Sequence, residues 1–379
     1  MSKRLLQEKG FDFIAVEGEW ADSYRVNQYI KGELRDSAAT VALLRQYNRW
    51  PTWMWGNHEV ASLVTWLNKY NQGKPSADKA GFFGLDVYCL WESMTELMPH
   101  IKGDQALVKA AKQVHQCFQP FSADAMQYAE AVAKADANCR AETNRLWKAM
   151  EQQTQSAEKA KTEAQFVAEQ NALVALNGER YYRTAVSSNS ASWNIRDHHM
   201  MQTLKRLLDF HGPNSKAIVW QHNTHVGDAR YTNMAAAGEV NVGQLARKEY
   251  GDEKVFIVGF GSYSGSVIAA QKWGAPMKKI EVPPATEGSR EHLLHQLSPA
   301  DKIILSKNIR EEKLLNRSVG HRAIGVVYNP EYEHLGNYVP SVIPKRYDAF
   351  VYIDRTNALR PIEKITVRNE PPDMYPWGT

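Results

Sequence analysis

The chain has 379 residues, of which 43% are hydrophobic and 23% are charged, and its formal charge at pH 7 is +4. These proportions are ordinary for a soluble globular protein. No run approaches the ~20 consecutive apolar residues of a membrane-spanning helix, so we expect no membrane association. Basic residues are scattered and often lie beside acidic ones, as in 247–254. Without a basic stripe to neutralise a row of phosphates, we expect no nucleic-acid partner.

The three cysteines, Cys89, Cys117 and Cys139, are widely spaced, odd in number and free of any Cys-x-x-Cys pair. This pattern predicts neither a disulfide framework nor a cysteine zinc site, and it favours reduced thiols in the cytosol. The polar start, residues 1–13, lacks the apolar segment of a secretory signal. We therefore expect a cytoplasmic protein.

In chain order, the first predicted element is the end of an amphipathic helix over 2–10, with Gly10 as its C-cap. Short apolar runs, typical of buried strands, follow at 11–17, 82–86, 217–221, 255–261, 323–328 and 349–354. The helical patterns between them include 58–71 and 193–211. This alternation predicts an α/β fold in which a mainly parallel sheet is flanked by helices on both faces.

The stretch from about 104 to 177 has a different composition, rich in Ala, Gln, Glu and Lys with few strand-forming residues. Apolar residues such as Leu107, Ala110 and Val114 recur at helical spacing. We predict two or three long helices that form an inserted hairpin or arm. A structural cap is the favoured role for this insertion, and a lid over the substrate is the alternative.

The best local signal for chemistry is the stretch 217–230, in which His222 and His225 directly follow an apolar strand. Ligand sites in open parallel sheets lie beyond the carboxyl ends of the strands. Histidine at such a place serves as a base, an acid or a hydrogen-bond donor near neutral pH. A metal site is an alternative, although no third ligand stands at a diagnostic spacing. A purely structural loop is the other alternative.

Two carboxylates end predicted strands in the same way. A carboxylate at the end of a buried strand is costly unless it is hydrogen-bonded or paired. Glu17 is therefore a candidate to orient a histidine or to accept a proton from water. Asp86 has the same place in its strand and is a candidate for substrate binding. For each residue alone, the simpler interpretation is a strand end at the solvent surface.

An aromatic cluster supplies a third feature. Trp50, Trp53 and Trp55 lie close together, followed by His58, and Pro51 argues against a helix there. Such a cluster is suited to the apolar wall of a pocket for a bulky ligand, with Trp53, Trp55 and His58 in contact with the substrate. Core packing is the commoner use of tryptophan and remains the alternative.

The glycine-rich stretch 259–265 lacks the Lys-Ser/Thr ending of a phosphate loop and the full dinucleotide fingerprint. It also lacks the Gly-x-Ser-x-Gly elbow of an α/β-hydrolase. We interpret it as a tight turn at a strand exit, bordering the site.

Taken together, these segments resemble the erythromycin esterase family, which includes proteins of succinoglycan biosynthesis. The matching stretches occur in family order and cover nearly the whole chain: 14–32, 50–67, 81–88, 193–200, 219–230, 240–267 and 322–331. The resemblance implies a single α/β domain over 1–379 with a helical insertion. It also implies hydrolysis of an ester or macrolide lactone by water, without a metal ion or other cofactor. In family members, the residues that match Glu17, His222 and His225 line the active site.

The sequence departs from the family pattern at its start. That pattern begins with a strand and a Gly-Glu-x-x-His-Gly turn, whose histidine is the family's general base. No such motif occurs in this sequence, and the match places Met1 in the helix after that turn. General-base assistance contributes about 10²–10⁴-fold in rate. We therefore expect the chain from Met1 to be a poor esterase even where the rest of the site is intact.

Three hypotheses follow. The first is a hydrolase of a small-molecule ester or lactone, in which His222 or His225 stabilises the oxyanion and Glu17 orients an imidazole or the water. The second is a non-catalytic binding or accessory protein linked to polysaccharide production. The third is a metal-dependent hydrolase. The first requires Glu17 and both histidines to face one common cavity.

Overall fold

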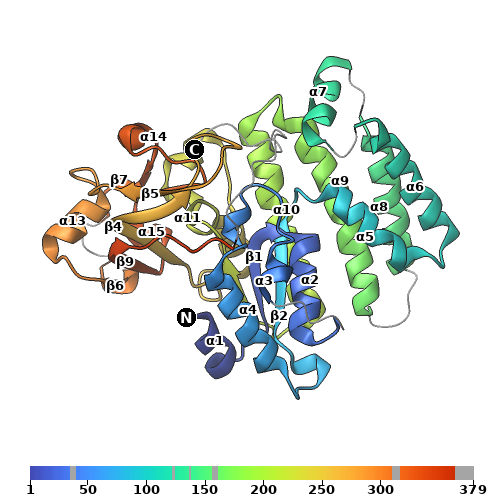
Figure 1. Ribbon diagram of the computed structural model, residues 1–379, viewed down its shortest axis with the longest axis horizontal. Coiled ribbons are helices and arrows are strands. Elements are labelled where there is room, and N and C mark those ends of the chain that lie inside the picture. Colours follow the sequence, from blue (N-terminus) through green and yellow to red (C-terminus); the bar gives the residue numbers. More distant parts are fainter. Residues whose placement is uncertain (35–39, 122–123, 136–137, 156–160, 310–315, 363–379) are drawn as a thin grey trace. The chain divides into compact units, whose positions relative to one another are not determined.

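The computed structural model (Figure 1) describes residues 1–34, 40–121, 124–135, 138–155, 161–309 and 316–362. Two compact units divide these residues. The first holds 1–34 and 64–220, and the second holds 40–63 and 221–362. Helices and sheets occur in both units, so the predicted α/β class is confirmed.

The first unit is built on a three-stranded parallel sheet in the order β2-β1-β3. The strands are β1 (Phe13–Glu19), β2 (Gly81–Asp86) and β3 (Ala217–Trp220), each at a predicted apolar run. Every residue of β1 and β2 is buried, whereas the residues of β3 are half-buried or exposed. Phe13 of β1 lies opposite Gly81 and Ala217, so the carboxyl ends of the strands point the same way.

Helices pack on this sheet and on one another, and several begin or end where the sequence predicts. The first helix ends at Lys9, and Gly10 caps it with φ 63°, a conformation that suits glycine. The predicted helix 58–71 is confirmed, and the helix predicted over 193–211 begins four residues earlier, after the N-cap Ser188. The helices are α1 (Ser2–Lys9), α2 (Trp20–Lys31), α5 (Leu90–Ile101), α6 (Gln105–Phe118), α7 (Ala125–Ala135), α8 (Arg140–Gln155), α9 (Glu163–Ala185) and α10 (Asn189–His211), together with the part of α4 (His58–Asn71) from Val64 on.

The stretch 104–177 is helical in its described parts, as predicted. Helix α6 packs against α8, and α8 packs against α9, side by side in Figure 1. Their shared core contains Leu107, Val114, Leu146 and Met150. Residues 122–123, 136–137 and 156–160 of this stretch lie outside the described residues. That these helices form an insertion, and whether it is a cap or a lid, stay predictions.

The cysteine prediction is wrong in one respect. Cys117, near the end of α6, and Cys139, just before α8, form a disulfide with 5.8 Å between their Cα atoms. Cys89 is free and buried. The sequence separation of 22 residues gives no sign of this pairing. Only the antiparallel return of the chain, from α6 through α7 to α8, brings the two thiols together.

The second unit contains a four-stranded mixed sheet and a two-stranded sheet. The strand order of the first is β5-β4-β9-β6, in which β4 pairs with β9 in parallel and the outer strands are antiparallel. Among the described residues, the all-parallel sheet is therefore that of the first unit. The strands are β4 (Val258–Ala269), β5 (Lys278–Val282), β6 (Lys302–Leu305), β7 (Val319–Arg322), β8 (Tyr338–Ser341) and β9 (Ala349–Thr356). The helices are α3 (Thr40–Leu44), α11 (Asn223–Val226), α12 (Val242–Tyr250), α13 (Arg290–Leu297), α14 (Glu333–Gly336) and α15 (Ile343–Arg346).

The glycine-rich stretch 259–265 is not the predicted strand-exit turn, because β4 continues through it. A Cβ atom on Gly259 would lie 2.6 Å from the Tyr347 ring, and one on Gly261 would lie 2.5 Å from Phe350 Cζ. These two glycines therefore make room for neighbouring aromatic rings and do not turn the chain. The prediction mistook a packing requirement for a turn.

The strand predicted at 323–328 is also wrong. The described strand of this region, β7, ends at Arg322, and the following residues make an isolated bridge between Val327 and Ala270. Ala270 donates its N–H to the Val326 carbonyl and accepts from the Tyr328 N–H. A single bridge is not a strand, although the apolar run 323–328 has the pattern of a strand.

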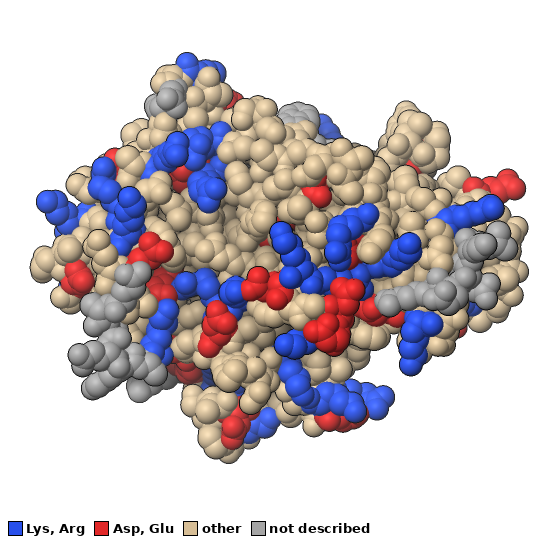
Figure 2. Space-filling view, turned by 180° about the vertical axis from the view of Figure 1, so that it is seen from behind, with Lys and Arg blue, Asp and Glu red and all other residues tan. Residues whose placement is uncertain are grey.

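The surface carries both signs of charge. On the face in Figure 2, lysine and arginine side chains lie beside aspartate and glutamate side chains. Among the described residues, no helix has the length and apolarity to cross a membrane. The predicted absence of a nucleic-acid partner stays a prediction.

Candidate active site

Two candidate carboxylates of the first unit meet at the carboxyl ends of neighbouring strands. Glu17 lies in β1, and Asp86 ends β2, where it is opposite Glu19. Both side chains are buried. The Arg196 guanidinium, from α10, joins them: its Nη2 donates to Glu17 Oε1 at 2.9 Å and to Asp86 Oδ2 at 2.7 Å, and its Nε donates to Asp86 Oδ1 at 2.9 Å. The sheet thus brings Glu17 and Asp86 together.

Arg196 is the central residue of this cluster, and the sequence analysis missed it. Burial opposes its charge, but Asp86, Tyr88 and Glu17 raise the pKa of Arg196 well above its ordinary value. Its guanidinium carbon lies 5.1 Å from the centre of the Tyr88 ring. The signal was present: Arg196 is three residues after the buried Trp193 and four before the buried Met200, on the core-facing side of α10. A buried arginine implies a buried acidic partner.

His199 lies one helical turn further along α10 and is neutral near pH 7. Asn177 Nδ2 lies 3.0 Å from its Nδ1, and its buried Nε2 has no hydrogen-bond partner among the described residues. Burial lowers the pKa of His199 from 6.5 to about 4. An imidazole that stays neutral in the folded protein but is protonated in the unfolded chain makes stability depend on pH.

We expect the free energy of unfolding to fall on acidification because of His199. Between pH 6.5 and about 4 the unfolded chain binds a proton at this residue and the folded chain does not. The stability contribution is complete above pH 6.5 and is lost through that window, by about 3 kcal/mol. Urea unfolding at several pH values should show a weaker pH dependence for His199→Gln than for the wild type. An unchanged profile for His199→Gln, matching that of the exposed control His100→Gln, would contradict this assignment.

In the second unit, both candidate histidines belong to one turn that follows β3. His222 is the N-cap of α11, and its Nδ1 accepts from the Thr224 N–H at 3.3 Å and lies 2.8 Å from Thr224 Oγ1. Its Nε2 lies 3.1 Å from the Ile324 carbonyl oxygen, which can only accept. The partners therefore assign the proton of His222 to Nε2. His225 is buried at the end of the same short helix.

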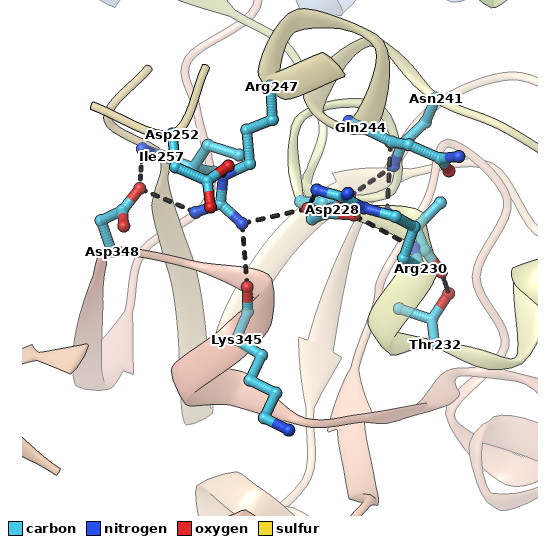
Figure 3. Close-up of polar contacts among 12 residues, drawn as sticks. Asp228, Arg230, Thr232, Asn241, Gln244, Arg247, Asp252, Ile257, Lys345 and Asp348 are labelled. Carbon is cyan, nitrogen blue, oxygen red and sulfur yellow. Dashed lines mark hydrogen bonds and ion pairs between the residues drawn. The ribbon is translucent and has the colours of Figure 1, made fainter. Parts of the chain in front are cut away.

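The chain after His225 is held by a polar network (Figure 3). Asn241 Nδ2 donates to the Thr224 carbonyl at 2.7 Å and to the Gly227 carbonyl. Arg247 donates to Asp228 Oδ2 at 3.1 Å and to Asp348 Oδ2 at 2.8 Å. Burial opposes ionisation of Asp228, but hydrogen bonds from arginine side chains lower its pKa overall. The segment that follows the two histidines is thus held by Asn241 through its backbone and by Arg247 through Asp228.

The aromatic candidates lie in the second unit as well. Trp53 and Trp55 are buried, with 3% and 7% of their surface exposed, and Trp53 packs edge-on against Trp50. His58 is exposed at the start of α4, and its backbone N–H donates to the Arg360 carbonyl. The contact of Trp53, Trp55, His58 and Asp86 with a substrate stays a prediction.

The chemistry available at the two clusters differs. The first unit offers carboxylates held by a guanidinium, and the second offers a neutral imidazole with a fixed N–H donor. Among the described residues, no three His, Cys, Asp or Glu side chains gather as a metal site would require. The convergence of Glu17 with His222 and His225 on one cavity stays a prediction.

One family model and three solved structures are similar to this chain. The erythromycin esterase family model matches residues 6–356. A protein from Bacillus cereus is 17% identical, with a TM-score of 0.77 over 96% of this chain and 85% of that chain. A succinoglycan biosynthesis protein is 15% identical, with a TM-score of 0.74 over 96% and 84%. A mutant of erythromycin esterase EreC in its open conformation is 14% identical, with a TM-score of 0.68 over 96% and 87%. These structures share the fold of this chain.

Proposed function

Because this chain belongs to the erythromycin esterase family, we propose that it is a hydrolase that cleaves a carboxylic ester or a macrolide lactone. Water attacks the carbonyl carbon, the bond to the alcohol oxygen breaks, and a carboxylic acid and an alcohol are released. No metal ion or other cofactor takes part in this proposal. The observation that supports it best is the fixed N–H donor of His222.

His222 is proposed as the group that stabilises the oxyanion. Its Nε2–H now donates to a carbonyl oxygen, that of Ile324. A substrate carbonyl oxygen that displaces the Ile324 oxygen accepts the same hydrogen bond, which strengthens as negative charge develops on the substrate oxygen. Because Thr224 occupies Nδ1, the donor tautomer exists before the substrate binds. The donor then needs no proton rearrangement during the reaction.

His225 and Glu17 complete the proposal. His225 is a second imidazole on the same turn, close enough in sequence to act on the same substrate. Glu17 is proposed to orient an imidazole or the attacking water. The Arg196 guanidinium donates to Glu17 Oε1 at 2.9 Å and so holds this carboxyl group in place.

The test is a panel of simple esters and macrolide lactones, with acid release followed by titration at constant pH. The wild-type chain should release acid from at least one substrate, and His222→Ala should fall toward the buffer rate. Equal release by the wild type and by His222→Ala would remove His222 from the mechanism.

A second candidate function is that of a non-catalytic accessory protein. The likeness to a succinoglycan biosynthesis protein favours it, since that name refers to polysaccharide production. Calorimetry on the same panel separates the two candidates. Binding without acid release would support the accessory role and overturn the hydrolase proposal.

A further inference from the structure

Asn223, which lies between the two histidine candidates, is fixed by its side-chain amide. Its Oδ1 accepts from the Phe260 N–H at 3.1 Å, and its Nδ2 donates to the Phe260 carbonyl at 2.6 Å. The amide therefore pairs with β4 in the way that a neighbouring strand would. Its Nδ2 also lies 3.4 Å from Nε2 of His321, at the end of β7.

His321 is fully buried and is held by a fully buried carboxylate. Its Nδ1 lies 2.6 Å from Glu291 Oε1, and neither side chain has any exposed surface. A carboxylate oxygen accepts, so His321 carries its proton on Nδ1 and leaves the Nε2 lone pair to accept from Asn223. This arrangement satisfies both ring nitrogens of a group that would otherwise be costly to bury.

The same carboxylate also holds the backbone two residues before Ile324, the residue whose carbonyl pairs with His222. Glu291 Oε2 accepts from the Arg322 N–H at 3.1 Å. Two residues further along the chain, the Ile324 carbonyl accepts the Nε2–H of His222. Glu291 is thus connected to the histidine turn in two ways. One connection runs through the His321 ring to Asn223, and the other runs through the backbone from Arg322 to Ile324.

The strand β4 passes close to the Glu291 carboxylate. A Cβ atom on Gly261 would come within 2.8 Å of Glu291 Oε1. The glycine therefore allows β4 to pass beside the carboxylate, and β4 also carries Phe260, the backbone partner of Asn223. One buried carboxylate, one buried imidazole and one amide form a continuous chain of contacts.

We propose that Glu291 and His321 are positioning residues that fix the orientation and the Nε2–H tautomer of His222. Resting on the proposed function, this role explains why the donor nitrogen points in one direction before substrate binds. The sequence analysis identified neither residue. They act through Asn223 and Ile324 and need no contact with the substrate.

The first variant is His321→Asn, whose amide keeps a donor for Glu291 but is too short to reach Asn223. We expect kcat to fall by about tenfold to 10²-fold, the cost of a misplaced catalytic group. KM should change by less than about twofold, because the affected interaction acts in the transition state. A purely structural role predicts reduced stability with an unchanged kcat for the folded fraction.

The matched control is His295→Asn. His295 Nδ1 also lies 2.7 Å from a carboxylate oxygen, that of Asp354, and its ring stacks on Tyr263, so its contacts given for the described residues do not include the histidine turn. The kcat of the His295→Asn variant should equal that of the wild type. An equal loss of kcat in His295→Asn and His321→Asn would overturn the proposal.

The second variant, Glu291→Gln, keeps the size of the side chain and tests the tautomer directly. If the oxygen of the introduced amide accepts from the Arg322 N–H, the nitrogen of that amide faces His321 Nδ1 and donates to it. The His321 proton then moves to Nε2, and the hydrogen bond from Asn223 is lost.

Nitrogen NMR of the imidazole rings shows which ring nitrogen carries the proton, and it needs no substrate. The wild type should show His321 protonated on Nδ1 and His222 on Nε2, and Glu291→Gln should shift both spectra. An unchanged His222 spectrum in both Glu291→Gln and His321→Asn would overturn the positioning role. If the wild type cleaves no substrate, the hydrolase proposal fails, but the NMR result still decides whether these residues position His222.

Discussion

Replacement of His222 by alanine should lower kcat/KM for the cleaved ester by about 10²–10³-fold, the usual effect of removing one oxyanion donor. The reason is the fixed donor geometry: Nδ1 is occupied by Thr224, and Nε2 directs its proton at a carbonyl oxygen. Most of the loss should appear in kcat, because the hydrogen bond strengthens only as the oxyanion forms.

The measurement is steady-state kinetics on the best substrate of the panel, with His334→Ala as the matched control. His334 is an exposed histidine of the same unit, in α14. Thermal unfolding of each variant confirms that the proteins compared are folded. A loss below about fivefold for folded His222→Ala would contradict the oxyanion role, since that is far under the usual cost of removing such a donor.

Replacement of Arg196 by leucine should reduce the free energy of unfolding by about 3–5 kcal/mol. Without the guanidinium, the buried carboxylates of Glu17 and Asp86 would lose the cation that both contact. Arg196→Lys should recover only part of the loss, since an ammonium group cannot reproduce the paired contacts with Asp86. Urea unfolding measures these differences.

The control for Arg196 is Arg4→Ala. Arg4 pairs with Glu8 on the surface of α1, with 78% of its side chain exposed, so its removal should have little effect on stability. Adding Asp86→Asn to Arg196→Leu should restore part of the lost stability, because one uncompensated charge is then removed. A stability change below about 1 kcal/mol for Arg196→Leu would show that the cluster is solvated or protonated in another way.

The sequence predicted those elements whose pattern is local. The helix 58–71 and the strands at Glu17 and Asp86 were found because their apolar spacing and end residues lie within a few positions of one another. The pattern failed where neighbours distant in the chain decide the conformation. At Gly259 and Gly261 the deciding groups are the rings of Tyr347 and Phe350.

The same limit applies to the candidate site. Histidines after an apolar strand are a visible signal, and both lie on one turn as the sequence suggests. Their supports are not visible, because His321 is 98 residues from Asn223 and 30 from Glu291. The helical periodicity of α10 indicates that Arg196 lies on its buried face. The proximity of Glu17 and Asp86 to each other depends on the register of β1 with β2, which the sequence does not reveal.

The most direct measurement is a single turnover in ¹⁸O-labelled water, with the protein in excess over a cleavable ester. If water attacks the carbonyl directly, the released acid carries one ¹⁸O from the first turnover and the mass of the protein stays unchanged. If a protein carboxylate attacks instead and water then opens the resulting anhydride at the protein's carbonyl, the first acid released contains no label and the ¹⁸O appears in the protein. That second result would contradict hydrolysis by activated water at the His222 turn.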